Sequence, residues 1–197
     1  MFTYLPVSLP LPPDSLIDQI LQSEQDKTLT WSPEQQERFS KYTDPSYLER
    51  TVLYNGHQHK SRVQRKYLLP DEVSAWVRES LPKNHTSAMI AASQGGPFQG
   101  PHIDAIRHYV LYLSLDPGGS DVKTSFWKLP HHPVTFDQPV WPKLTQDYPD
   151  VEHIESVVLE KNQWYILNGW VYHSIENMVS NRISLQLDYD NIELILK

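Results

Sequence analysis

The chain of 197 residues contains no cysteine. Disulfide frameworks, zinc ribbons, thiol nucleophiles and thiolate-bound iron are therefore excluded, so a metal ion could be bound only by nitrogen and oxygen atoms. The sequence also lacks any apolar stretch near the roughly 20 residues that a bilayer crossing requires, and its first residues include no basic segment typical of a signal peptide. We expect a soluble, cytoplasmic protein without a membrane partner.

Positive charge is in the minority. Seventeen Lys and Arg residues stand against 24 Asp and Glu residues, which gives a net charge of −7. A field of this sign repels polyanions and argues against nucleic acid as a partner. Hydrophobic residues make up 39% of the chain, with six Trp and eleven Tyr, so the protein is too apolar to be disordered. Its length fits one domain over residues 1–197.

The first part of the chain carries the helical signals. Sixteen prolines divide the sequence into pieces too short for a helical bundle. Capping residues and apolar spacing predict three helices, over residues 15–22, over 34–42 and beginning at Pro70. We therefore expect residues 1–84 to be mainly helical and to pack on a β domain.

From about residue 87 the hydrophobic period changes from helical to alternating. Short runs of this kind are too frequent to leave room for parallel crossovers, which favours an antiparallel sandwich or barrel with helices on one face. Asn168-Gly169 between two runs predicts a hairpin turn. The predicted strands cover residues 87–92, 102–115, 120–128, 157–159, 164–167, 171–174 and 182–189.

One predicted strand has two contrasting faces. Its apolar face carries Tyr109, Leu111, Leu113 and Leu115, and its polar face carries His108, Tyr112 and Ser114. A polar face opposite an apolar one suits a barrel with a wet, ligand-holding interior and an outer layer of helices.

Candidate metal ligands begin at His102. A strand places His102 and Asp104 on the same face, where they can bind one ion. Five histidines follow Asp104, and only His173 lies in a β-patterned stretch with a basic residue, Arg182, opening the next strand shortly after it. Arg182 and Ser184 share a strand face, and a guanidinium with a hydroxyl suits a buried carboxylate. Taken singly, each of these residues also fits an ordinary structural role.

Residues 57–66 are very polar. His57-x-His59 predicts a solvated loop, and no glutamate follows it at the spacing of a cupin metal site. The basic run from Lys60 to Lys66 predicts a solvated face that could also meet an anionic substrate.

Two histidines and one carboxylate on one side of an ion form the facial triad of non-haem Fe(II) oxygenases. With Arg182 nine residues after His173, the sequence over roughly residues 85–190 resembles the Fe(II)/2-oxoglutarate-dependent dioxygenases. The resemblance implies a double-stranded β-helix, or jelly-roll, as the core, and Fe(II) and 2-oxoglutarate as cofactor and cosubstrate. It implies that iron is bound by His102, Asp104 and His173. It further implies that the cosubstrate is contacted by Arg182, Ser184, Tyr112 and Ser114.

The spacing of nine residues between His173 and Arg182 and the stretch 87–92 are more similar to the prolyl-hydroxylase branch. In that branch an arginine at the position of Arg107 approaches the substrate. Ser93 and Ser114 stand where that branch often has tyrosines. The resemblance implies reaction with dioxygen, release of succinate and carbon dioxide, and hydroxylation of a peptide or protein side chain, with proline the first candidate, or of an amino acid. The alternatives are a non-catalytic jelly-roll that binds a ligand or a partner protein, and a cupin-type metal-dependent isomerase or hydrolase.

Overall fold

The computed structural model of the chain describes residues 2–26, 49–54, 57–62, 64–93, 96–102, 104, 107–128 and 152–196. For residues 24–26, 49–54, 57–62, 64–65 and 96–102 it describes the backbone alone. Over these ranges the protein is mostly β-structure with two α-helices, which confirms the expected fold class. The predicted helix over residues 34–42 lies outside the described residues.

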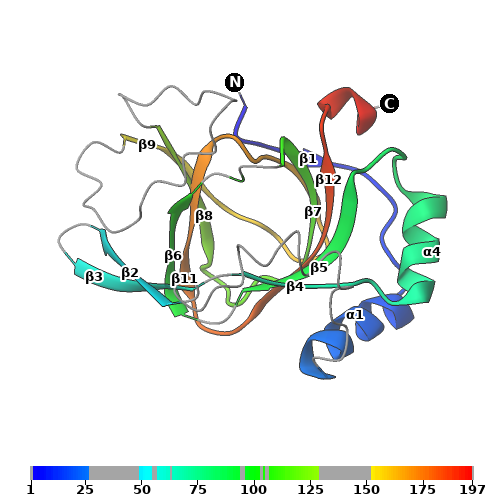
Figure 1. Cartoon of the computed structure of the whole chain (residues 1–197), viewed down its shortest axis with the longest axis horizontal. Coiled ribbons are helices and arrows are strands. Elements are labelled where there is room, and N and C mark those ends of the chain that lie inside the picture. Colours follow the sequence, from blue (N-terminus) through cyan, green and yellow to red (C-terminus); the bar gives the residue numbers. More distant parts are fainter. Residues whose placement is uncertain are drawn as a thin grey trace.

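Two antiparallel sheets face each other (Figure 1). The larger has six strands in the order β1 (Tyr4–Val7), β10 (Trp164–Asn168), β7 (Tyr109–Asp116), β12 (Arg182–Tyr189), β5 (Ser87–Ser93) and β4 (Gln64–Tyr67). The smaller has four, in the order β6 (Gly96–His102), β11 (Tyr172–Met178), β8 (Lys123–Lys128) and β9 (Glu152–Val158). A two-stranded sheet of β2 (Glu49–Tyr54) and β3 (His57–Arg62) lies beside β6.

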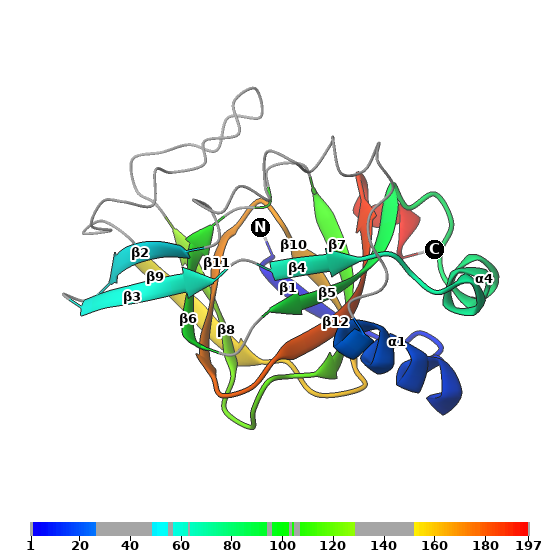
Figure 2. The ribbon, with the colours of Figure 1, turned by 60° about the horizontal axis from the view of Figure 1, so that its bottom comes forward.

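Helices α1 (Asp14–Asp26) and α4 (Asp71–Ser80) lie on the side of the six-stranded sheet that faces away from the four-stranded sheet (Figure 2). Each presents an apolar stripe to the core, through Ile20 in α1 and through Val73 and Val77 in α4. No helix in the described part of the chain has both the length and the apolarity needed to cross a bilayer. The expected layer of helices on one face of the barrel is thus present.

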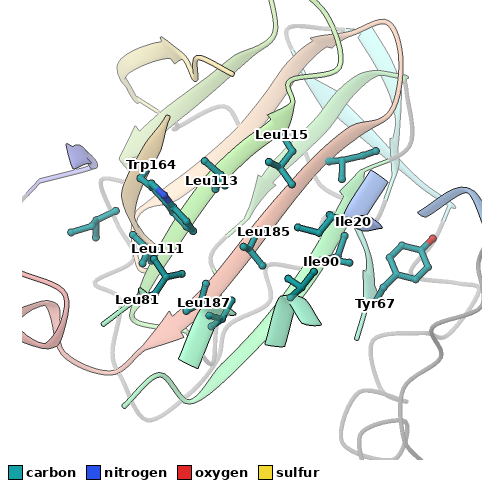
Figure 3. Close-up of a cluster of buried hydrophobic side chains, with 14 of the residues drawn as sticks. Ile20, Tyr67, Leu81, Ile90, Leu111, Leu113, Leu115, Trp164, Leu185 and Leu187 are labelled. Carbon is teal, nitrogen blue, oxygen red and sulfur yellow. The ribbon is translucent and has the colours of Figure 1, made fainter. Parts of the chain in front are cut away.

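Alternation along β7 and β12 gives each strand a core face and a cavity face. Fully buried leucines from both strands pack with Ile20 in one cluster (Figure 3). Burial of each such side chain contributes about 1.5–3 kcal/mol. The intervening residues Tyr112 and Gln186 point the other way, into the space between the two sheets. The leucines are Leu111, Leu113, Leu115, Leu185 and Leu187.

The single strand predicted over residues 102–115 is wrong, because this segment belongs to both sheets. β6 ends at His102 and pairs with β11, whereas β7 begins at Tyr109 and pairs with β10 and β12. Asp104 therefore lies in the crossing between the sheets, where its carbonyl accepts a hydrogen bond of 3.0 Å from the backbone N–H of Arg107. No glycine or proline stands between His102 and Tyr109, so the sequence carried no turn signal at the break.

The part before residue 85 differs from the mainly helical expectation, since its described residues form four strands as well as two helices. β1 and β4 extend the six-stranded sheet at its two edges. His57 and His59 lie in β3, so the loop predicted there is wrong. Edge strands of this kind are held by backbone pairing and need no apolar alternation, which explains why a very polar sequence gave no strand signal.

Asn168-Gly169 does not form the predicted hairpin, because the strands it joins belong to different sheets. β10 pairs with β1 and β7, and β11 pairs with β6 and β8. The turn closes with a bond of 3.2 Å from the N–H of Val171 to the carbonyl of Asn168. A Cβ on Gly169 would lie 2.3 Å from the carbonyl oxygen of Arg107, so the glycine is required for close approach to the other crossing segment.

Candidate active site

A cavity between the two sheets brings most of the candidate residues together. It encloses about 510 Å³ of empty space, including the part open to solvent. Asp104 and Arg107 line it at the crossing segment, Arg182 lines it from the six-stranded sheet, and His173 lines it from the four-stranded sheet. Asp104 and Arg182, which are 78 positions apart in the sequence, thus share one site, because the segment between β6 and β7 and strands of both sheets border the same cavity.

Asp104 and His173 are placed to share a metal ion. Oδ2 of Asp104 lies 3.9 Å from Nε2 of His173. Two atoms that each bind one divalent ion at about 2.1 Å are at most about 4.2 Å apart, and about 3.0 Å apart at the 90° angle of a facial triad, so this pair can share an ion after approaching by roughly 1 Å. Nδ1 of His173 lies 2.9 Å from the carbonyl oxygen of Val171, so Nδ1 carries the proton and the lone pair is on Nε2, the atom nearer to Asp104.

The third candidate ligand, His102, lies on the strand next to His173. The two residues are direct partners in the β6–β11 register. Direct partners in an antiparallel pair carry their side chains on the same face of a sheet. Among the side chains that the structure describes, no three His, Asp or Glu residues form a metal-binding group, and the side chain of His102 is outside that set. The metal triad therefore stays a prediction, although the structure brings two of its three residues, Asp104 and His173, close together.

Arg107 forms an ion pair with the oxygen of Asp104 that lies away from the His173 contact. Nη2 of Arg107 lies 2.7 Å from Oδ1 of Asp104, and Nη1 donates to Oε1 of Gln186 at 2.7 Å. A longer contact of 3.5 Å joins Nη1 to Oδ1 of Asp188. Burial by itself would lower the pKa of Arg107, but the carboxylates of Asp104 and Asp188 outweigh it and raise the pKa above its ordinary value.

A lysine adds to this buried group of charges. Burial, and then the charge of Arg107, lower the pKa of Lys66 to about 8, while Asp104 and Asp188 act in the opposite direction. Lys66 is in register with Ala91, and the next residue, Tyr67, packs into the core on the other face of the sheet. Lys66 therefore belongs to the cavity face of β4, whereas the sequence predicted a solvated face that could also meet an anionic substrate.

Arg182 lies deeper in the same cavity and is 4% exposed. Its Nε donates to Oη of Tyr112 at 2.8 Å, and both Nη atoms donate to Oγ1 of Thr124 at 3.2 Å. Its guanidinium carbon lies 5.2 Å from the centre of the Tyr112 ring. No carboxylate of the described part of the chain lies within 4.0 Å of this guanidinium. A buried cation with neutral partners is costly and fits an anion supplied by a ligand.

The two serines predicted to bind the cosubstrate lie in the same region. Ser184 is the direct register partner of Ser114, and both are buried. Oγ of Ser184 accepts a bond of 3.0 Å from Nε2 of Gln186. Oγ of Ser114 is fully buried and has no hydrogen-bond partner among the described residues. Thr124 was missed, because its contact with Arg182 joins two sheets and leaves no local pattern in the sequence.

No family model matches the sequence, and no curated protein matches it significantly. Several solved structures match over nearly the whole chain, including two with TM-scores of 0.50 and 0.51. One is a prolyl hydroxylase from Trichoplax adhaerens in complex with a hypoxia inducible factor oxygen degradation domain peptide fragment, with a TM-score of 0.50 and 11% identity over 98% of this chain and 86% of that chain. The other is AviO1 from Streptomyces viridochromogenes Tue57, with a TM-score of 0.51 and 13% identity over 96% and 90%.

At these identities the matches establish the fold. The two facing antiparallel sheets are those of a double-stranded β-helix, the fold that the sequence resemblance implied. The chain shares this fold with a prolyl hydroxylase, which confirms the resemblance at the level of the fold.

Proposed function

We propose that the protein is an Fe(II)- and 2-oxoglutarate-dependent oxygenase. In this proposal His102, Asp104 and His173 hold the iron, and Arg182 binds the far carboxylate of 2-oxoglutarate. The observation that carries it is the guanidinium of Arg182, buried among neutral groups in the cavity that also contains the Asp104 and His173 pair. A dicarboxylate bound between iron and Arg182 would neutralise that buried charge.

The donor set fits the group that the fold implies. Imidazole nitrogen and carboxylate oxygen are suitable ligands for Fe(II), and a facial triad leaves positions open for other molecules. When bound, Fe(II) and 2-oxoglutarate would supply the activation of dioxygen that yields succinate, carbon dioxide and a hydroxylated C–H bond. The chain's own residues bind and orient: Tyr112 and Thr124 fix the guanidinium of Arg182, and Phe126 adds an apolar wall beside His173.

For the substrate we propose a peptide or protein side chain, with proline the first candidate, or a free amino acid. The matching prolyl hydroxylase is in complex with a peptide fragment, which supports this class by analogy of fold alone. The net charge of −7 supports the same order, because it disfavours oligonucleotides.

Anaerobic titration with Fe(II) and 2-oxoglutarate tests the cofactor assignment. The wild-type protein should develop the weak visible charge-transfer band of an iron-bound 2-oxo acid, and His173→Ala should not. His153→Ala is the matched control, because His153 is an exposed residue of β9. Absence of the band in the wild-type protein would refute the proposal.

The substrate class is tested by the release of succinate from 2-oxoglutarate in air. Proline-containing peptides should stimulate it most, followed by free amino acids. Stimulation by oligonucleotides but by no peptide or amino acid would overturn this order.

A further inference from the structure

The two oxygens of Asp104 have different surroundings. Oδ2 lies 3.9 Å from Nε2 of His173, on the side where a metal ion would be bound. Oδ1 lies 2.7 Å from Nη2 of Arg107. A carboxylate can bind a metal ion through one oxygen or through both. Here an arginine already occupies one of the two.

The guanidinium of Arg107 is itself fixed. Arg107 is 8% exposed, and its Nη1 donates to Gln186 at 2.7 Å and contacts Asp188 at 3.5 Å. Gln186 is oriented in turn, because its Nε2 donates to Oγ of Ser184 at 3.0 Å. Both Nη atoms are thus engaged within the protein, and the planar fork of an arginine can join Asp104 to β12 in a way that a lysine cannot.

The backbone of Asp104 is held as well. Its N–H donates to the carbonyl of Gly169 at 2.8 Å, and the N–H of Gly169 donates to the carbonyl of His108 at 3.0 Å. The Asp104 segment is therefore pinned to the turn after β10 by its main chain and to β12 through Arg107. Little freedom remains for the carboxylate to rotate and turn Oδ1 toward the cavity.

We propose that Arg107 is a positioning residue, which occupies Oδ1 of Asp104 and restricts this carboxylate to binding a metal ion through Oδ2 alone. The inference rests on the proposed function and assigns Arg107 a task other than the substrate contact predicted from the sequence. Its consequence is a coordination position kept open: a carboxylate bound through both oxygens would take a position that 2-oxoglutarate or dioxygen needs.

The inference separates metal affinity from cosubstrate affinity. Arg107 and a divalent cation repel each other, so Arg107→Gln should bind Fe(II) at least as tightly as the wild-type protein does. With Oδ1 released, Asp104 can bind through both oxygens and close one position. The affinity of the Fe(II)-loaded variant for 2-oxoglutarate should fall at least tenfold, which corresponds to about 1.4 kcal/mol.

Mn(II) provides a readout that does not depend on turnover. Broadening of its electron paramagnetic resonance signal in ¹⁷O-enriched water counts the exchangeable water molecules on the ion. We expect about three in the wild-type protein without cosubstrate, as for a facial triad, and one fewer in Arg107→Gln. Arg107→Lys keeps the charge and one donor, so it should restore part of the difference. Arg78→Gln, at an exposed site on α4, is the matched control and should equal the wild-type protein in all measurements.

Each outcome decides the matter. An Arg107→Gln protein with the wild-type water count and wild-type 2-oxoglutarate affinity refutes the inference and leaves the proposed function intact. A wild-type protein that binds neither Mn(II) nor Fe(II) refutes both. If Arg107→Gln does not fold, the wild-type count and Gln186→Met carry the test, since Gln186→Met removes an acceptor of Arg107 without changing any charge. The inference is refuted if the wild-type protein has two exchangeable water molecules on Mn(II) instead of three. It is also refuted if Gln186→Met loses neither a water molecule on Mn(II) nor affinity for 2-oxoglutarate.

Discussion

Arg182→Met is the most informative substitution for the proposed function, because it should change cosubstrate affinity far more than it changes the stability of the ligand-free protein. Methionine keeps an unbranched apolar stem and removes the charge. In the ligand-free protein the guanidinium gains hydrogen bonds to Tyr112 and Thr124, each contributing about 1.5–3 kcal/mol. Against these stands the desolvation of a buried cation that has no carboxylate partner among the described residues, which costs several kcal/mol. The two nearly cancel, so the free energy of unfolding should change by less than about 1 kcal/mol.

Binding of 2-oxoglutarate should respond far more strongly. Loss of one partner of a buried, hydrogen-bonded charge pair costs about 2–5 kcal/mol, which is a fall in affinity of about 30-fold to several thousandfold. Urea denaturation with and without Fe(II) and 2-oxoglutarate measures both effects in one assay. At 100 times its Kd the ligand stabilises the wild-type protein by about 2.7 kcal/mol, and at the same ligand concentration this gain should fall below about 0.9 kcal/mol in Arg182→Met.

The control for this experiment is Arg78→Met, at an exposed arginine in the last turn of α4. It should keep the full stabilisation by ligand. If Arg182→Met destabilises the ligand-free protein by more than about 3 kcal/mol, Arg182 has a structural charge partner and the reasoning is wrong. Equal 2-oxoglutarate affinity in mutant and wild type would remove the main argument for this cosubstrate.

Three further predictions concern the surroundings of the site. Gly169→Ala places a Cβ 2.3 Å from the carbonyl oxygen of Arg107 and 3.1 Å from Cβ of Asp104. It should therefore lower the free energy of unfolding by about 1–3 kcal/mol and weaken Fe(II) binding. Wild-type values in urea denaturation and in Fe(II) titration would contradict this. Ser114→Ala removes a buried hydroxyl without a described partner, so the ligand-free protein should unfold with the same or up to about 1 kcal/mol higher free energy, and a loss above that size would contradict the assignment. The pKa of Lys66 is about 8 in the folded protein, below its ordinary value of 10.5. As the pH rises, the folded protein therefore releases this proton at a lower pH than the unfolded chain does. The free-energy penalty for burying the charge is present in full below pH 8 and declines from pH 8 to 10.5. The gain in stability of metal-free Lys66→Met over the wild-type protein should therefore be larger at pH 7 than at pH 9.5. A gain that does not depend on pH would contradict this prediction.

The sequence predicted the parts of the fold that repeat a simple period. Leucines two residues apart in β7 and β12 identified the core face, and the structure places them in one buried cluster. The same alternation placed Tyr112, Ser114 and Ser184 on the opposite face. At the break between His102 and Tyr109, where the chain leaves one sheet for the other, the sequence gave no turn signal, because no glycine or proline lies there.

Contacts between sheets were beyond prediction for a related reason. Thr124 reaches Arg182 across 58 positions, and Gln186 reaches Arg107 across 79. Neither residue belongs to a motif, and each was indistinguishable from an ordinary strand residue. Lys66 was predicted on a solvated face that could also meet an anionic substrate, because its neighbours in sequence are polar, although its strand adds to the edge of the large sheet. The sequence therefore predicts which residue types the site uses more readily than which neighbours hold them.

One strand connects the stability of the core to the geometry of the site. The odd residues of β12, from Ile183 to Tyr189, are buried in the core, while Arg182 and Gln186 line the cavity. Seven register pairs with β5 and a further ladder with β7 fix this alternation. A slip by one residue would turn the leucines into the cavity and the arginine toward the helices, at a large cost in buried apolar area and desolvated charge. The packing of the core thus selects the one register in which the guanidinium of Arg182 and the support of Arg107 face the same cavity.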